Sequence, residues 1–386
     1  MTPERDPIMT TFIQIHALQS VPPSCINRDD TGSPKSAMFG GVKRHRVSSQ
    51  AWKRAMRNEF TSHLDRSELG VRTLEVIGEI ANAIQTKREI GDELAVEFAQ
   101  EIFTQAGFKV NEKKLKKAKD AKAADADANE PLPKSEYLIF LSRSEINALA
   151  DLAIQLADGE KPTKKAIREA FQKEQAFDVS LFGRMLANAP ELNTDAACQV
   201  MHAISTHGAN AEFDYFTAVD DLAPEDNAGA GMIGTVEFVS STLYRYACIN
   251  FDQLVSNIGD KDAAVRCVDA FIKAFALSMP TGKANTFANR TRPDLVLAEV
   301  GEQQPYSLVN AFEAAIKTED SAIKNSVDAL AKYREAVVAE YGQRAERSLH
   351  MSTRTVTSDE ARELLTSNSS PVNFDDLVAG VAEVLK

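Results

Sequence analysis

Apolar and polar residues alternate in the first element of the chain, Thr11–Ser20, where Ile13 and Ile15 flank Gln14. This period of two predicts a half-buried strand. The next segment is rich in Pro, Gly, Asp and Ser and predicts a long loop, and residues 37–47, which contain a Gly-Gly pair, predict a short hairpin. An apolar stripe at helical spacing then predicts a helix over residues 50–63, capped by a serine at 48 or 49. This order is typical of an α+β domain.

The middle of the chain has a different pattern. Helical periodicity dominates residues 67–175, with a lysine-rich, then acidic stretch at 109–134 that has no apolar face. These residues predict a helical insertion that contains a low-complexity linker. Strand patterns return at Val179–Leu186, Cys198–Thr206, Thr235–Asn250 and Leu295–Val300, and helical ones at Gln253–Met279 and Leu308–Tyr341. Residues 206–234 form a long excursion with central aromatics, and the tail from Arg347 is polar until a final helix, Phe374–Lys386.

Composition excludes several classes of protein. The 386 residues are 44% hydrophobic and 26% charged, which excludes global disorder, and no apolar run is long enough to span a membrane. The four cysteines are isolated, so neither a zinc knuckle nor a disulfide framework is indicated. The first residues lack the pattern of a signal peptide. We therefore expect a soluble, reduced, cytoplasmic protein.

Charge is distributed unevenly along the chain. The net charge is −12, yet Thr31–Asn58 contains no acidic residue and seven cations: Lys35, Lys43, Arg44, Arg46, Lys53, Arg54 and Arg57. A concentrated basic strip on an acidic body is typical of an anion-binding surface. The strip also runs into a serine-capped helix start, where backbone N–H groups attract phosphate. A merely solvated strip is the alternative, but surface helices normally mix both signs of charge.

Other candidate sites are less specific. No common catalytic signature occurs in the sequence. Asp29 and Asp30 could hold a divalent cation, although adjacent carboxylates in such a loop more often stabilise turns. Aromatic residues at 213, 215 and 216 could stack on bases or form a local core. Gly282-Lys283 could contact phosphate, or the glycine could cap a helix.

Two long segments resemble a known family. INRDDTGSPKSAMFGGVKRHRVSSQAWKRAMR and HAISTHGANAEFDYFTAVDDL, the latter followed by GTVEFVSSTLYRYACIN, are similar to the backbone subunit of the type I-E CRISPR Cascade surveillance complex. This subunit, often called CasC, belongs to the RAMP superfamily. FGRM at 182–185 and NAFEAAIK at 310–317 also fit, and the resemblance spans residues 12–341.

The resemblance implies a hand-like α+β architecture. We expect an RRM/ferredoxin-like palm (8–66, 177–205 and 235–346), a helical fingers insertion (67–176), a β-hairpin thumb (206–234) and a C-terminal tail with a short helix (347–386). In the family, positions matching Arg28, Lys35, Ser48, Gln50, Lys53 and Arg57 face the guide backbone. Met185 would help to wedge the RNA, and Phe216 and Thr217 would lie in the thumb. With the basic strip and the Gly-Lys loop, the expected RNA contacts also include Lys43, Arg44, Arg46 and Lys283.

The function implied by the resemblance needs no chemistry by this chain. Several copies would polymerise along one guide CRISPR RNA and present it for pairing with target DNA in antiviral defence. Other Cascade subunits would be direct partners, and a nuclease-helicase would be recruited indirectly, with no membrane, cofactor or metal involved. The alternative is a metal-dependent endoribonuclease of the RAMP superfamily that uses Asp29 and Asp30. A stand-alone RNA chaperone is a third class.

Overall fold

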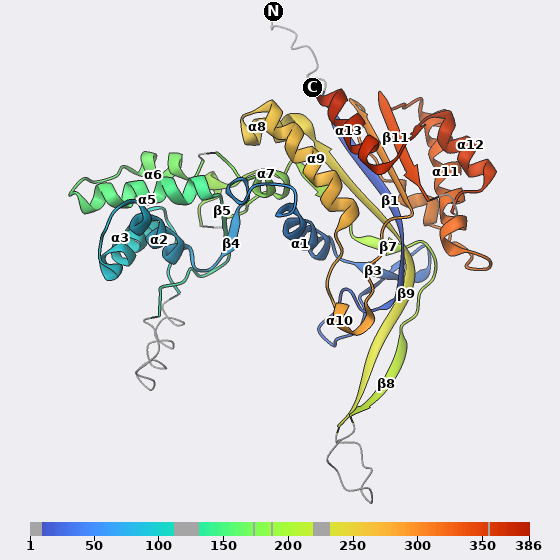
Figure 1. Cartoon of the computed structure of the whole chain (residues 1–386), viewed down its shortest axis with the longest axis horizontal. Coiled ribbons are helices and arrows are strands. Elements are labelled where there is room, and N and C mark those ends of the chain that lie inside the picture. The colour runs from blue at the N-terminus through green and yellow to red at the C-terminus, as the bar shows by residue number, and fades with distance from the viewer. Residues whose placement is uncertain (1–9, 112–130, 173, 187, 219–231, 354–355) are drawn as a thin grey trace, which may run out of the picture. The chain divides into compact units, whose positions relative to one another are not determined.

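The computed structural model describes residues 10–111, 131–172, 174–186, 188–218, 232–353 and 356–386. The chain forms two compact units (Figure 1). The first contains the residues up to Phe60 together with Cys198–Phe251 and Val265–Lys386, and the second contains Thr61–Ala197 and Asp252–Ala264. The α+β class expected from the sequence is confirmed.

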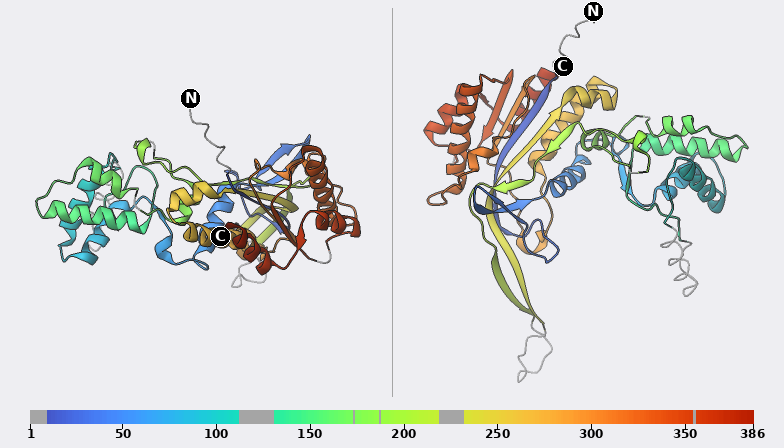
Figure 2. Two further views of the ribbon diagram at one scale, coloured as in Figure 1. Left: turned by 90° about the horizontal axis from the view of Figure 1, so that it is seen from above. Right: turned by 180° about the vertical axis from the view of Figure 1, so that it is seen from behind.

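A large, mostly antiparallel sheet forms the centre of the first unit (Figure 2). Its strand order is β12-β11-β10-β1-β9-β7-β3-β2, and β6 and β8 also pair with β9; only β11 and β12 run parallel. The strands are β1 (Phe12–Ser24), β2 (Ser36–Phe39), β3 (Val42–Val47), β6 (Cys198–Val200), β7 (Ala203–Ser205), β8 (Glu212–Ala218), β9 (Met232–Asn250), β10 (Leu295–Gly301), β11 (Arg347–Ser352) and β12 (Ser370–Pro371).

Helices cover both faces of this sheet. Leu18, Tyr244 and Leu297 share a core with η3 (Leu308–Phe312), α11 (Ala322–Tyr341) and α12 (Asp359–Ser367). Arg245 points to the other face, where it meets α1 (Ser49–Phe60) and α9 (Lys261–Leu277). On that face α13 (Phe374–Leu385) packs against β10 and β11, and Gly380 lies against the side chain of Leu349.

The early sequence pattern predicts the local structure well. The first strand, the 37–47 hairpin and the helix that follows are all confirmed. The first strand differs in one respect: Gln14 and His16 are buried, because helices pack on both faces of β1. The predicted helices after residue 250 are confirmed as α8 (Phe251–Ile258), α9, η3 and α11, joined by the short α10 (Ala284–Phe287).

The second unit is mainly helical. Its elements are η1 (Arg66–Glu68), β4 (Val71–Thr73), α2 (Val76–Lys87), α3 (Asp92–Gln105), β5 (Ile139–Leu141), α5 (Arg143–Ala157), α6 (Lys164–Ala170), α7 (Phe177–Phe182) and η2 (Pro190–Leu192). Alanine, isoleucine and phenylalanine side chains of α2, α3 and α5 form its core. Ser142 begins α5 with a capping box, in which it exchanges hydrogen bonds with Glu145.

Two expectations about the chain's organisation differ from the structure. The predicted strand Val179–Leu186 is instead α7 and the loop after it, and these residues belong to the second unit. They are held there by Asp178, which accepts the N–H of Gly70 at 2.8 Å, and by Asn257, which donates to the carbonyl of Ser180 at 3.0 Å. The polar tail from residue 347 is not peripheral either, because β11 extends the central sheet beside β10.

The excursion between the strands contains a β-hairpin. β8 pairs antiparallel with the first residues of β9, from Glu212 opposite Phe238 to Ala218 opposite Met232. The same β9 strand continues into the middle of the sheet (Figures 1 and 2), so one strand carries both the hairpin and part of the core. Residues 219–231 lie outside the described part of the chain.

Candidate nucleic-acid interface

A groove of about 750 Å³ opens beside the N-terminal half of α1. Its walls come from the end of β1 and the loop after it, from α1, and from the segment that links α9 to α10. The lining residues are Ile26, Asn27, Arg28, Ser48, Gln50, Ala51, Arg54, Ala55, Asn58, Glu59, Ser278, Met279, Pro280, Thr281, Gly282, Lys283 and Arg290. All of them belong to the first unit.

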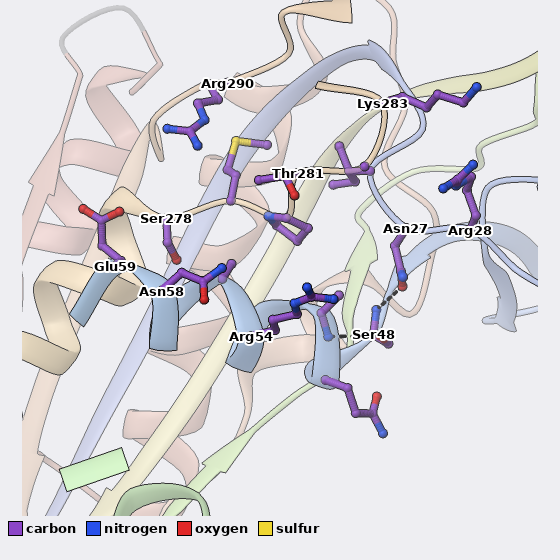
Figure 3. Close-up of a pocket in the computed structure, with 17 residues that line it drawn as sticks. Asn27, Arg28, Ser48, Arg54, Asn58, Glu59, Ser278, Thr281, Lys283 and Arg290 are labelled. Carbon is purple, nitrogen blue, oxygen red and sulfur yellow. Dashed lines mark hydrogen bonds between the residues drawn. The ribbon is translucent and has the colours of Figure 1, made fainter. Parts of the chain in front are cut away.

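The charge of this groove is strongly positive. Figure 3 shows Arg28 and Lys283 at one end, Arg290 and Glu59 at the other, and Arg54 between them on α1. Glu59 is the only carboxylate among the lining residues. Within the described residues, none of the four cations forms an ion pair. Unpaired cations around a hollow of this size suit a phosphate-bearing ligand.

The loop from Met279 to Lys283 is held close to the end of β1. A Cβ on Gly282 would lie 2.5 Å from the carbonyl oxygen of Ile26 and 2.6 Å from that of Cys25, so only glycine permits this approach. The next residue, Lys283, has a left-handed backbone with φ of 51°, which is uncommon outside glycine. Because α9 ends at Leu277, Gly282 is not the helix cap that the sequence left open.

The start of α1 is less available to an anion than the sequence suggests. The N–H of Ser48 donates to Asn27 Oδ1 at 2.8 Å, and the N–H of Ser49 donates to His202 Nδ1 at 2.9 Å. Burial and the nearby charges of Arg46 and Lys35 lower the pKa of His202, which favours the neutral ring that accepts this bond. These two backbone donors are therefore occupied by the protein itself.

One predicted contact residue has a structural role instead. Arg44 is fully buried and donates to backbone carbonyls from three separate segments. Its Nη1 reaches the carbonyl of Thr206 at 2.7 Å, and its Nη2 reaches that of Phe312 at 2.9 Å. The expectation that Arg44 contacts RNA is therefore corrected: the guanidinium cross-links the sheet to η3.

The other predicted cations remain at the surface to different degrees. Lys43 is exposed on β3, whereas Lys35 and Arg46 are half-buried and lie near His202. On α1, Gln50 is exposed, and Lys53 and Arg57 are half-buried on the same helix as the groove-lining Arg54. The strip predicted from the sequence is thus a real surface feature with one buried member.

Asp29 stabilises a turn. One carboxylate oxygen accepts the N–H groups of Thr31 and Ser33, each at 3.0 Å, and the hydroxyl of Thr31 at 2.7 Å. These hydrogen bonds, chiefly that of the Thr31 side chain, lower the pKa of Asp29. Its neighbour Asp30 is exposed. Among the described residues, no group of three or more His, Cys, Asp or Glu side chains is placed to hold a metal ion.

The remaining candidates lie away from the groove. Phe216 and Thr217 are on β8, and Phe216 is 41% exposed. Met185 lies in the second unit, in the loop after α7, and is 84% exposed. Its neighbour Arg184 is buried and pairs with Glu145 at 2.8 Å, which fixes the backbone beside this projecting side chain.

Comparison with known families matches residues 13–380 to the family described as "CT1975-like protein". The chain belongs to this family. Among solved structures, this CT1975-like chain is similar to a chain of a "CRISPR RNA-guided surveillance complex, pre-nicking", with 32% identity and a TM-score of 0.83 over 97% of this chain and 100% of that one. A chain of a "CRISPR RNA-guided surveillance complex" is 28% identical, with a TM-score of 0.71 over 96% and 99%. No curated protein matches.

Two groove residues of this CT1975-like protein escape sequence reasoning. Arg54 lies within the acid-free strip, and its position one residue after Lys53 could have identified it. Arg290 follows a different helix, more than 200 residues later, and no local pattern distinguishes it. Separately, none of the described helices is both long and apolar enough to cross a membrane.

Proposed function

We propose that this CT1975-like protein is a non-catalytic RNA-binding subunit of a CRISPR RNA-guided surveillance complex. The observation that carries the proposal is the likeness to a chain of such a complex over 97% of this chain and all of that one. A likeness over two whole chains supports a shared role better than one that covers a single domain, because the accessory hairpin and helical unit are then included.

The groove supports binding to the RNA backbone rather than to bases. Arg28, Arg54 and Lys283 present charge without ion-pair partners among the described residues, and guanidinium groups bind phosphate in a bidentate way. Contacts of this kind give affinity without sequence preference. In a guided complex, base pairing supplies the sequence information and the protein holds the RNA backbone.

The finer part of the proposal concerns assembly. The long motifs around residues 26–57 and 202–222 resemble the type I-E backbone subunit, so this chain is proposed to polymerise along one guide RNA. Neighbouring copies, other Cascade subunits and paired target DNA would then be its partners, and target cutting would fall to a separately recruited nuclease-helicase.

The salt dependence of guide binding tests the backbone contacts. Replacing Lys53 and Arg57 together by Ala should weaken binding to RNA of any sequence and reduce the salt slope by about 0.7 for each lost phosphate contact. A matched control removes two exposed cations elsewhere in the first unit, Lys324 and Arg344. Equal slopes in the two double variants would refute a specific role for these α1 side chains.

Incubation with RNA and Mg²⁺ tests the absence of chemistry. The guide-bound wild type should leave complementary RNA and DNA intact, and Asp29→Ala with Asp30→Ala should change nothing beyond a small loss of turn stability. Metal-dependent cleavage by the wild type that disappears in this variant would replace the proposal with an endoribonuclease.

A further inference from the structure

Two residues face each other directly across the hairpin, Phe216 on β8 and Gly234 on β9. A Cβ built on Gly234 would clash with the Phe216 ring: Cζ is the nearest atom, and Cε1 and Cε2 follow at 2.8 and 3.0 Å. The ring therefore occupies the space that any side chain at position 234 would fill. Glycine inside a strand weakens it, so its presence here calls for a reason of this kind.

These distances also give the orientation of the ring. If the ring pointed its edge at Gly234, both Cε atoms would be much farther away than Cζ. Instead they are nearly as close, so one face of the ring covers Gly234. The opposite face points outward, and the side chain is 41% exposed, compared with 68% for Phe213 and 63% for Tyr215 on the same strand.

We propose that the outward face of Phe216 is a stacking site for one unpaired nucleobase, and that Gly234 is a positioning residue that holds the ring flat. This inference rests on the proposed RNA-binding function. A ring already fixed against the hairpin loses little freedom when a base stacks on it, which favours binding. The ring presents its face, so the base stacks on Phe216 rather than being split from its neighbour by the ring's edge.

The neighbouring side chains favour a base over a phosphate at this point. Val236 and Phe238 share the face of Phe216, and Phe238 packs at 6.0 Å against Phe287 of α10, the helix that Lys283 precedes. Four strand residues separate Phe238 from Gly234, a distance of about 13 Å. The groove loop and the stacking site therefore lie along one side of the hairpin.

Carboxylates on the same hairpin face set a further limit on the ligand. Glu212 and Asp214 lie opposite Phe238 and Val236 and are exposed. They disfavour a phosphate close to β8, whereas a neutral base can approach the ring. The expected ligand is thus a base that extends from a backbone held by the groove cations.

The first test concerns the ring itself and needs no RNA. In the full chain labelled with ¹³Cα-glycine, the Gly234 Hα resonances should be shifted upfield by the ring, and Gly234→Ala identifies them by their loss. Phe216→Leu should move them downfield. Unchanged Gly234 resonances in that variant would overturn the geometry.

The second test separates positioning from stability. Gly234→Val improves strand propensity, so a purely structural role predicts unchanged or better RNA binding. The positioning role predicts that Gly234→Val and Phe216→Ala each weaken binding of a single-stranded RNA oligonucleotide by about tenfold. Both variants should bind an abasic oligonucleotide like the wild type. Thr235→Val, which adds a branched side chain on the opposite face, is the control and should bind normally.

The outcomes distinguish this inference from the proposed function. If the wild type binds RNA but Gly234→Val does not weaken it, or weakens base-bearing and abasic strands alike, the stacking site is wrong and the RNA-binding proposal stands. If the wild type binds neither strand, both are overturned. Loss of binding confined to the base-bearing strand supports the site.

Discussion

The guanidinium of Arg245 lies 3.6 Å from the centre of the Trp52 ring, which joins the central strand β9 to helix α1. Phe275 of α9 covers the same group at 4.4 Å. Arg245 is fully buried, donates to Gln19 Oε1 at 2.7 Å, and also donates to the carbonyl of Phe275. Burial lowers its pKa to about 9. The helix that carries the basic strip is therefore anchored by a buried cation.

Removing this anchor should destabilise the first unit. Arg245→Ala would leave two buried acceptors without a donor and a cavity under α1, for a loss of roughly 3–5 kcal/mol in the free energy of unfolding. Arg245→Met refills much of the space and should be milder. Urea unfolding followed by Trp52 fluorescence measures both. Equal stability of the Ala and Met variants would contradict a packing role.

Arg44 and Arg54 should behave in opposite ways although both lie in the basic strip. Arg44→Ala removes the donor for carbonyls of β7, η3 and the β2–β3 turn, so we expect a loss of several kcal/mol, on the order of 1–3 kcal/mol for each acceptor left unpaired. Arg54→Ala should change stability by less than about 0.5 kcal/mol, because the side chain is exposed.

Salt titration of RNA binding completes this comparison. Arg54→Ala should reduce the salt slope, since its side chain lines the groove. A folded Arg44→Ala variant with normal stability and a reduced slope would show that Arg44 contacts RNA after all.

Stability should decrease as the pH falls from about 6.5 to about 4. Burial, with a smaller effect of His207, lowers the pKa of His45 to about 4, and burial, with a smaller effect of Arg334, does the same for His350. Between these pH values the unfolded chain binds more protons than the folded one. Each ring therefore removes up to roughly 3 kcal/mol of stability by pH 4.

Glu299 extends this loss to lower pH. Burial alone would raise its pKa, but contact with His16 and the charge of Arg334 lower it to about 2, so its contribution is lost from about pH 4.5 downward. Unfolding free energies measured between pH 4 and 7 test the histidines, and His45→Gln should flatten the curve. A wild-type slope in that variant would show that His45 titrates equally in both states.

The buried pair of Arg184 and Glu145 should dominate the stability of the second unit. Arg184 also donates to the carbonyls of Phe140, Phe171 and Leu192, so Arg184→Met strands an acid whose pKa burial already raises. We expect a loss of about 3–5 kcal/mol. Arg168→Met breaks a surface pair with Glu191 in the same unit and should lose less than about 1 kcal/mol.

Protease sensitivity tests whether this pair also fixes the loop that carries Met185. Cleavage near Met185 should increase in Arg184→Met and stay at the wild-type level in Arg168→Met. Similar cleavage in both variants would show that Arg184 does not hold this loop.

Local pattern was sufficient wherever an element's environment repeats along the chain. Thr11–Ser20, the 37–47 hairpin and the helix from residue 50 follow from period and turn chemistry, because strand pleat and helical pitch act over neighbouring residues. The acid-free strip follows from composition in the same way. Residues 179–186 mislead, because a short apolar run suits a buried strand and a buried helix equally.

Tertiary structure decided which charged groups are available and what they face. Lys43 and Arg44 are adjacent in sequence, yet one is exposed and the other is buried among backbone carbonyls of distant segments. Arg290 joins Arg28 and Arg54 only because chain packing brings residues far apart in sequence to one groove. Gly234 gains its meaning from Phe216 across the hairpin. The sequence alone determined the kinds of charge and the periodic elements, whereas burial and cross-strand contact depend on non-local packing, which no window of neighbouring residues contains.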